Sequence, residues 1–336
     1  MKRLALAVVV VGALAALASL PVPYGNFPAA AVLDIPRGAG AASIASILAD
    51  AGVIRWRWQF LLARAVRPRA RLQAGEYSFA DPASVLEVFD RLVRGDVFYY
   101  VVAVPEGANL FDIASKVAAL GLITEEQFLR EASDPSPVGD IAPRAPSLEG
   151  YLFPSTYRLT RHTTAKQFCR QMTDHFRQVW KELGSPAGAH ETVTLASMTE
   201  KETGVEAERP LVASVFRNRL STGMSLDCDP TTIYAALLDG RYRGVIHRSD
   251  LQSRNRYNTY QHAGLPPGPI ANPGRASLEA ALRPAETKYL FFVAKPGNSG
   301  THQFSTTLAE HQKAVASYRR GHPKAAPRRK AAGRGR

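Results

Sequence analysis

The chain has 336 residues, 46% of them hydrophobic and 21% charged, which is the composition of a globular protein with two or three domains. Its net charge of +13 suggests nucleic-acid binding, but eight of the Lys and Arg residues lie in residues 319–336, which leaves +5 for the rest. Because this stretch is rich in Pro, Ala and Gly and has no Phe, Trp or Tyr for base stacking, we expect a disordered basic tail and no nucleic-acid partner. The sequence has no nucleotide-binding motif, no serine-hydrolase elbow and no His group with metal-ligand spacing, so we expect neither cofactor nor metal.

The N-terminus predicts export. Met1-Lys2-Arg3 precedes an uncharged apolar run from Leu4 to Leu20, and the next charged residue is Asp34. Two interpretations remain open: a retained transmembrane anchor over residues 1–22, favoured by the length of the run, or a signal peptide with Ala16-Leu17-Ala18 as its cleavage site. The two cysteines, Cys169 and Cys228, could form one disulfide in an oxidising compartment or remain separate buried thiols.

Residues 27–135 contain one pattern twice. A strand at 32–35, a turn at Pro36-Arg37-Gly38 and a helix at 42–51 are followed by a second strand at 102–104, a turn at Pro105-Glu106-Gly107 and a helix at 111–120. The second copy resembles a LysM glycan-binding repeat, and a scaffold without sugar contact is the alternative. Between the copies we predict a strand at 74–79 and a helix that ends at Gly95.

Prolines, which interrupt helices and strands, occur twice in 134–137 and twice in 142–146 and predict a linker. We place a second domain at 145–318. Its predicted helices cover 165–183, 194–203, 209–220, 229–238 and 308–318, and its predicted strands cover 289–293 and 302–305. The fold class is therefore α+β: an N-terminal membrane anchor, small LysM-like α+β subdomains and a mixed α+β domain that follows them.

The most informative stretch is the apolar helical run at 194–204, which carries the carboxylates Glu200 and Glu202. At about 100° per residue, Glu202 shares a stripe with large apolar side chains such as Met198, whereas Glu200 lies roughly opposite. Gly204 predicts the helix end, which puts Glu202 in the last turn, where the helix dipole and burial both raise a carboxyl pKa. A carboxyl group that stays protonated near neutral pH can act as a general acid. The alternative is an acid that is solvated or paired with Lys or Arg.

Two downstream segments add to this stretch. Asp229-Pro230-Thr231 is typical of a helix start, and an N-cap role alone would explain Asp229. The segment from Ser253 to Gly274 is rich in Tyr, Asn and Thr and is stiffened by Pro, so it suits a carbohydrate groove, with a structural Ω-loop as the alternative.

The motifs of residues 196–305, taken in their order along the chain, resemble those of the MltG (YceG-like) family of endolytic murein transglycosylases. The likeness covers nearly the whole chain and is densest from Glu149 to His311. It is carried by 196–203, Glu208-Arg209, 215–220, Gly223-Met224, 229–231, 257–260, 264–270, 272–274 and 302–305. One departure is Asp227, which stands where the family usually has Gln.

The resemblance implies a single-pass inner-membrane protein with most of its chain in the periplasm, a catalytic domain at 145–318 and Glu202 as the catalytic residue. It also implies cleavage of nascent peptidoglycan glycan strands between N-acetylmuramic acid and N-acetylglucosamine, with 1,6-anhydro ends that terminate polymerisation. Penicillin-binding proteins and other wall-synthesis proteins are the implied partners. We expect the substrate-binding residues to be Glu208, Asn218, Asp229, Thr231, Tyr234, Tyr257, Asn258, Thr259 and Tyr260.

Two other functions remain as alternatives. The first is a membrane-anchored peptidoglycan-binding scaffold without turnover. The second is a lyase for a small chorismate-derived substrate, which would need pyridoxal phosphate and a buried Schiff-base lysine, for which Lys201 is a poor candidate.

Overall fold

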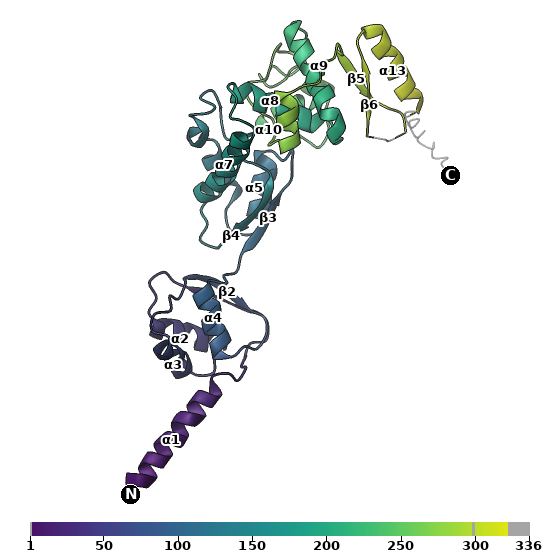
Figure 1. Ribbon diagram of the computed structural model, residues 1–336. Helices are drawn as coiled ribbons and strands as arrows, with labels where there is room; N and C mark the ends of the chain where they lie inside the picture. Colours follow the sequence, from purple (N-terminus) through teal and green to yellow (C-terminus); the bar gives the residue numbers. More distant parts are fainter. Residues whose placement is uncertain (1, 298–299, 322–336) are drawn as a thin grey trace, which may run out of the picture. The chain divides into compact units, whose positions relative to one another are not determined.

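The computed structural model describes residues 2–297 and 300–321. The chain divides into two compact units. The first contains the residues up to Val101 together with Arg158–Thr163, and the second contains Val102–Tyr157 and the residues from Thr164 onward. Figure 1 shows the elements of each unit along the chain.

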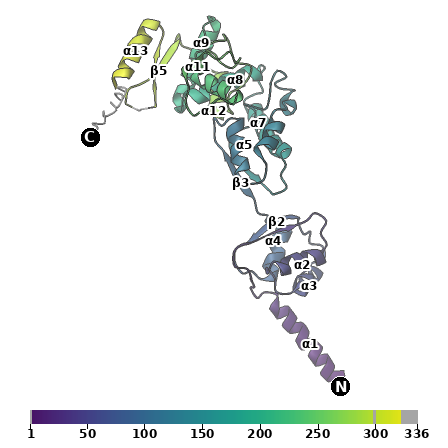
Figure 2. The same cartoon turned by 180° about the vertical axis from the view of Figure 1, so that it is seen from behind.

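The first unit is a small α+β structure. Its elements are α1 (Lys2–Ser19), β1 (Ala31–Ile35), α2 (Ala41–Asp50), α3 (Arg57–Val66), β2 (Gly75–Phe79) and α4 (Val85–Arg94). Strands β1 and β2 pair antiparallel, and α3 packs against both α2 and α4, as Figures 1 and 2 show. The predicted helix before Gly95 is confirmed: Ser84 and Glu87 form a capping box at its start, and Gly95 ends it with a left-handed φ of 70°.

Helix α3 was not predicted from the sequence. Its N-cap residue, Trp56, makes no capping hydrogen bond through its side chain, so the usual start signal is missing. The helix is held instead by burial of Gln59, Phe60 and Ala63 against the core.

Within residues 2–297 and 300–321, no helix combines the length and the apolar character that crossing a membrane requires. The anchor over residues 1–22 stays a prediction from the sequence.

The second unit is larger and mostly helical. Its elements are the part of β3 (Tyr100–Val104) from Val102 onward, α5 (Leu110–Ala118), α6 (Glu125–Ala132), η1 (Ser136–Val138), the part of β4 (Ser155–Leu159) up to Tyr157, α7 (Ala165–Glu182), α8 (Ala189–Glu202), η2 (Glu206–Glu208), α9 (Arg209–Ser221), α10 (Asp229–Leu238), α11 (Arg248–Leu251), α12 (Arg275–Leu282), β5 (Phe291–Ala294), β6 (His302–Ser305) and α13 (Leu308–Gly321). Strands β3 and β4 form one two-stranded sheet, and β5 and β6 form another. Helix α8 packs against α9, α10 and α12, so it lies at the centre of this unit.

The two copies of the sequence pattern belong to different units. The first copy is β1 and α2, whereas α5 of the second copy lies in the second unit. Asn272 holds that copy in place: its Nδ2 donates to the carbonyl oxygen of Ala108 and to Oε1 of Glu149, both at 2.9 Å. Its Oδ1 accepts hydrogen bonds from the backbone N–H groups of Gly150 and Leu152, also at 2.9 Å. The domain ranges given from the sequence stay predictions.

The breaker-rich segment at 134–146 packs into the second unit. It contains η1, and the side chains of Val138, Ala142 and Ala145 are buried. Hydrophobic side chains at these positions explain why Pro and Gly do not make this segment an exposed linker. At the other end, Arg319 and Arg320 belong to α13, and the predicted basic tail lies outside the described residues from 322 onward.

Both cysteines are buried free thiols, Cys169 on α7 and Cys228 directly before α10. The sequence left open a disulfide or two separate thiols, and in the structure Cys169 and Cys228 are separate thiols.

Candidate active site

Glu202 is the last residue of α8, and its side chain lines a pocket of about 380 Å³. We call this the Glu202 pocket. It is lined by three carboxyl side chains, one arginine, one histidine, one tyrosine and apolar side chains: Glu202, Phe216, Arg219, Leu226, Asp227, Asp229, Tyr260, Phe291, Phe292, Leu308 and His311. The predicted glycine cap is wrong, because Thr203 turns to an extended conformation with φ −139° and Gly204 is not left-handed.

Glu200 has a different environment. Its side chain is only 6% exposed and pairs with the equally buried Arg209 at 2.9 Å, while the N–H of Gly274 donates to its Oε2 at 3.0 Å. Both faces of α8 are therefore buried, and burial depth does not separate the two acids as the helical stripe suggested. The partner separates them: Glu200 is the paired acid, and Glu202 is the acid that lines the pocket.

The pKa of Glu202 is raised above the usual range of a glutamic acid. Removal from water contributes most, and the negative charge of Asp229 raises the pKa further. A hydrogen bond with the Cys228 thiol and the positive charges of His302 and Arg219 act in the opposite direction, but they do not reverse the shift. The carboxyl group therefore retains its proton to a higher pH than an exposed glutamic acid does, as a general acid requires.

Asp229 lies in the pocket instead of capping a helix. Cys228 occupies the N-cap position, Asp229 is the first helical residue of α10, and no side chain caps this helix. The hydroxyl group of Tyr260 donates to Oδ1 of Asp229 at 2.7 Å. The N-cap explanation for Asp229 is thus wrong, and the structure brings two predicted site residues together beside Glu202.

Thr231 and Thr259 set the backbone before Asp229. Oγ1 of Thr231 donates to the carbonyl oxygen of Cys228 at 2.6 Å, and the N–H of Cys228 donates to Oγ1 of Thr259 at 3.1 Å. The two hydroxyl groups also bond each other at 2.9 Å, and both side chains are fully buried. These threonines position the thiol and the aspartate that act on Glu202.

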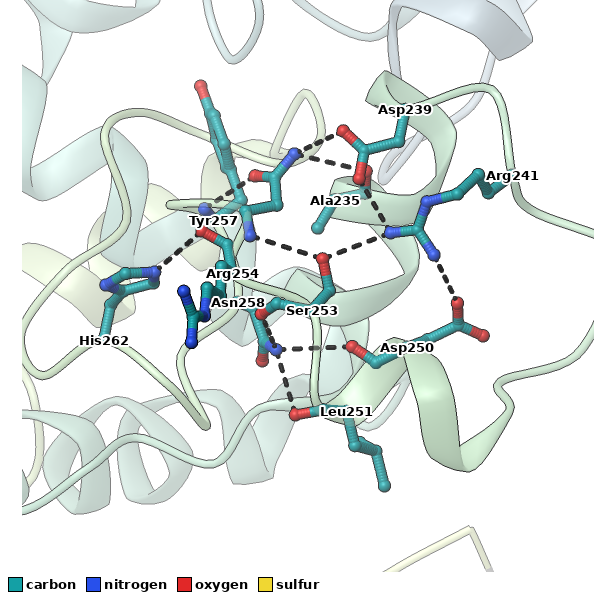
Figure 3. Close-up of polar contacts among 11 residues, drawn as sticks. Ala235, Asp239, Arg241, Asp250, Leu251, Ser253, Arg254, Tyr257, Asn258 and His262 are labelled. Atoms are coloured by element: carbon teal, nitrogen blue, oxygen red, sulfur yellow. Dashed lines mark hydrogen bonds and ion pairs between the residues drawn. The ribbon is translucent and has the colours of Figure 1, made fainter.

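Asn258 organises the loop that carries Tyr260. Figure 3 shows its side chain directed at Asp250, Leu251 and Ser253. Its Nδ2 donates to the carbonyl oxygens of Asp250, Leu251 and Ser253 at 3.3, 3.1 and 2.8 Å. Its Oδ1 accepts a hydrogen bond from the N–H of Tyr260 at 3.1 Å. The side chain is fully buried, so the loop is built around this amide.

Asp227, the departure from the family pattern, has a left-handed φ of 50°. Its carboxylate accepts a hydrogen bond from Oγ of Ser225 at 2.8 Å and pairs with Nη1 of Arg219 at 3.2 Å. Among residues with a side chain, Asp tolerates this backbone region better than most, because it can hydrogen-bond locally. The backbone conformation therefore accounts for an Asp at this position.

The far wall of the Glu202 pocket was missed by sequence reasoning. Arg219 donates from Nε to the carbonyl oxygen of Leu290 at 2.7 Å and lies over the ring of Phe291, 5.2 Å from its centroid. The ring of His311 stacks on Phe291 at 5.1 Å. Desolvation lowers the pKa of His311, and Arg219 lowers it further. One feature of the sequence pointed to this part of the pocket: Arg219 is a charged residue on the apolar face of the helix predicted at 209–220.

The remaining predicted substrate contacts lie outside the lining of the Glu202 pocket. Glu208 accepts hydrogen bonds from the backbone N–H and from Nδ1 of His302 at 2.9 and 2.8 Å, and Asn218 donates to two backbone carbonyl oxygens near β5 at 2.9 Å. The rings of Tyr234 and Tyr257 pack together at 5.1 Å. These side chains have partners inside the protein, and their contact with a substrate stays a prediction.

Among the described residues, no group of three or more His, Cys, Asp or Glu side chains is arranged to hold a metal ion. The Glu202 pocket holds three carboxyl side chains, Glu202, Asp227 and Asp229, and the pKa of Glu202 is raised.

The chain matches the YceG-like family over residues 33–317. It is 33% identical over 307 residues to the endolytic murein transglycosylase of Bacillus subtilis (strain 168), with 85% of this chain and 84% of the relative covered. It is 25% identical over 319 residues to the enzyme of the same name from Streptococcus pneumoniae (strain D39), of which it spans 58%. Its fold is similar to the crystal structure of a YceG-like protein from Listeria monocytogenes, with a TM-score of 0.55, 30% identity and coverage of 84% and 98% of the two chains. This chain belongs to the YceG-like family.

Proposed function

We propose that this protein is an endolytic murein transglycosylase, which cuts peptidoglycan glycan strands between N-acetylmuramic acid and N-acetylglucosamine. The observation that carries the proposal is the carboxyl group of Glu202, with its raised pKa, in a pocket shared with Asp229 and Tyr260. The names of the relatives from Bacillus subtilis and Streptococcus pneumoniae support the same activity.

In the proposed mechanism Glu202 works alone as acid and then as base. It donates its proton to the glycosidic oxygen while the bond to the anomeric carbon of the muramic acid breaks through an oxocarbenium-like state. The resulting carboxylate takes the proton of the muramic 6-hydroxyl group, whose oxygen bonds to the anomeric carbon and closes the 1,6-anhydro ring. Glu202 is then protonated again, and no water is consumed.

Asp229 has a supporting electrostatic role in this mechanism. Its negative charge disfavours ionisation of Glu202 before the reaction, and it would stabilise positive charge that develops on the sugar. The hydroxyl group of Tyr260 holds the aspartate in place through its 2.7 Å hydrogen bond. Neither residue has to act as a nucleophile.

The test is mass spectrometry of the products that the full-length protein releases from uncrosslinked glycan strands. We expect new internal ends that are lighter than hydrolysis products by one water molecule for each cut, because the ring closes without water. Reducing ends alone would indicate a hydrolase. Binding to the strands without any new ends would favour the membrane-anchored scaffold.

Lys201, the lysine weighed for the lyase alternative, has the wrong environment for a Schiff base. Lys201 is exposed, and its Nζ donates to the carbonyl oxygen of Gly107 at 3.1 Å, whereas a Schiff-base lysine needs a desolvated environment. The Lys201 environment therefore does not favour that chemistry.

The cellular role is a further part of the proposal. We propose that the protein faces the periplasm at the inner membrane and terminates glycan polymerisation beside penicillin-binding proteins. The support is the basic, then apolar, N-terminal sequence. Fractionation of cells that express the full chain should place it in the membrane fraction, with protease access from the periplasmic side only.

Asp229→Asn is expected to move the basic limb of the pH–activity profile to lower pH. The negative charge of Asp229 raises the pKa of Glu202, so removing that charge lowers this pKa. Glu202 must be protonated to act, and activity would then be lost at a lower pH than in the wild type. The pH dependence of the initial rate of anhydro-end formation measures the shift.

Asp239→Asn is the matched control. Asp239 lies at the other end of α10, pairs with Arg241 at 2.7 Å and is not among the groups that shift the pKa of Glu202. The same charge change there should leave the basic limb in place. A basic limb that stays unmoved in Asp229→Asn would contradict the electrostatic role.

A further inference from the structure

Two tryptophans stack on the surface of the first unit. Trp56 directly precedes α3 and Trp58 lies in its first turn; their ring centroids are 5.9 Å apart with an angle of 17° between the planes. Their exposed fractions are 43% and 41%, whereas Trp180, the third tryptophan of the sequence, is 2% exposed in the second unit. Tryptophan is enriched at interaction surfaces and at membrane interfaces, where one end of the side chain is apolar and the other is in contact with water.

The exposed apolar surface continues along α3. Leu61 is 39% exposed and Val66 is 64% exposed, while Phe60 and Ala63 on the other side of the helix lie in the core. Helix α3 therefore presents apolar side chains both inward and outward. We call the outward set, Trp56, Trp58, Leu61 and Val66, the Trp–Leu face.

The segment that carries this face is rich in positive charge. Residues 51–75 contain six arginines and no acidic residue. The guanidinium group of Arg55 lies 4.4 Å from the centroid of the Trp56 ring, and Arg69 and Arg71 are exposed just beyond α3. Two of the six pair with acids from other segments, Arg57 with Asp50 and Arg67 with Asp90, so the segment as a whole remains cationic.

Trp56 of the Trp–Leu face lies beside the end of α1, because it lines one pocket together with Ser19 and Val22. Nε2 of Gln59 donates to Oγ of Ser19 at 3.0 Å and to its carbonyl oxygen at 3.3 Å, and Ser19 is the last residue of α1. Val22, just after α1, is 58% exposed, and Leu14 and Leu17 on α1 are exposed as well. The end of α1 and the start of α3, each next to exposed apolar side chains, are thus in direct contact.

We propose that the Trp–Leu face contacts the interfacial region of an anionic phospholipid bilayer. Tryptophan partitions to the headgroup level of membranes, aliphatic side chains reach the acyl boundary, and arginine binds lipid phosphate. A glycan could stack on the two tryptophans, but it would not account for Leu61, Val66 or the cationic surroundings. The proposed contact places the first unit flat against the membrane surface next to α1. It is independent of the chemistry at Glu202.

Tryptophan fluorescence of the full-length protein, reconstituted in phosphatidylglycerol-containing vesicles, tests this contact. Part of the phospholipid carries bromine on the acyl chain close to the headgroup and quenches tryptophans at that depth. We expect clear quenching in the wild type. The variant Trp56→Phe/Trp58→Phe retains only Trp180 and should show almost none. Lipid should also protect the wild type from iodide, a water-soluble quencher.

Several outcomes would overturn the proposal. One is wild-type emission that brominated lipid does not quench. Another is iodide access that is equal in vesicles and in detergent. A third is a change of emission caused by soluble glycan strands but not by lipid, which would make the Trp–Leu face a sugar platform. Trp56→Ser/Trp58→Ser should cleave soluble glycan strands at the wild-type rate, so a failure of this proposal is distinguishable from a failure of the proposed function.

Discussion

Replacing Glu202 by Gln is expected to lower the rate of anhydro-end formation by about 100- to 10,000-fold, the usual contribution of a positioned general acid. Gln keeps the size and polarity of the side chain but has no acidic proton to donate to the glycosidic oxygen. Because Glu202 lines the pocket at the end of α8, the fold should be retained. Product mass spectrometry on uncrosslinked strands gives the rate, and circular dichroism checks the fold.

Glu206→Gln is the matched control for this variant. Glu206 is an exposed glutamate four residues further along, and it does not line the Glu202 pocket. The same chemical change there should leave the rate unchanged. Glu202→Gln should still bind glycan strands, since it loses the proton donor only. If both variants cleave at the wild-type rate, Glu202 is not the acid.

Replacing Arg209 by Met is expected to lower the free energy of unfolding by about 3–5 kcal/mol, the typical effect of leaving one member of a buried ion pair alone. Arg209 and Glu200 are 8% and 6% exposed and lie 2.9 Å apart, so water cannot replace the guanidinium group. The second partner of Arg209, Glu106, is 3.3 Å away and half exposed, and it should contribute less. Urea denaturation of both proteins measures the difference.

Two comparisons separate burial from charge in this experiment. Glu200→Gln/Arg209→Met removes both charges and should recover part of the lost stability, because Gln can still accept the hydrogen bond from Gly274. Arg130→Met breaks an exposed pair with Glu126 and should change stability by less than about 1 kcal/mol. If Arg209→Met and Arg130→Met lowered the free energy of unfolding equally, the buried ion pair would stabilise the fold no more than the exposed pair does.

Local signals in the sequence predicted most elements of the fold. Helix α4 has a capping box and a terminal glycine, and α7 begins with a capping box at Thr164, so both have start signals within a few residues. Helix α3 has no such signal and was missed, but α6 was missed as well, although Thr124 and Gln127 form a capping box at its start. The packing of 134–146 was also missed, because it depends on contacts with distant parts of the second unit.

The catalytic candidate was predicted from the sequence, but its surroundings were not. The helical stripe favoured Glu202, yet the distinction from Glu200 comes from Arg209, a tertiary partner. The environment of Glu149 also depends on tertiary contacts that the sequence did not reveal. Burial next to α5 raises the pKa of this carboxyl group to about 8. Phe291 and His311 reach the pocket from elements about 90 to 110 positions further along the chain. No periodicity within a single helix could place these residues beside Glu202.

The amide of Asn258 has a consequence for the thermodynamics of substrate binding. Fixing one backbone residue costs roughly 1–2 kcal/mol of conformational entropy, and the bonds to three carbonyl oxygens have already fixed this loop during folding. A sugar strand that binds at Tyr260 therefore contacts a loop that is already ordered. Little of the binding free energy is then lost to ordering this loop. We infer that a sugar strand binds this loop almost as it would bind a rigid surface, with a small loss of conformational entropy in the protein.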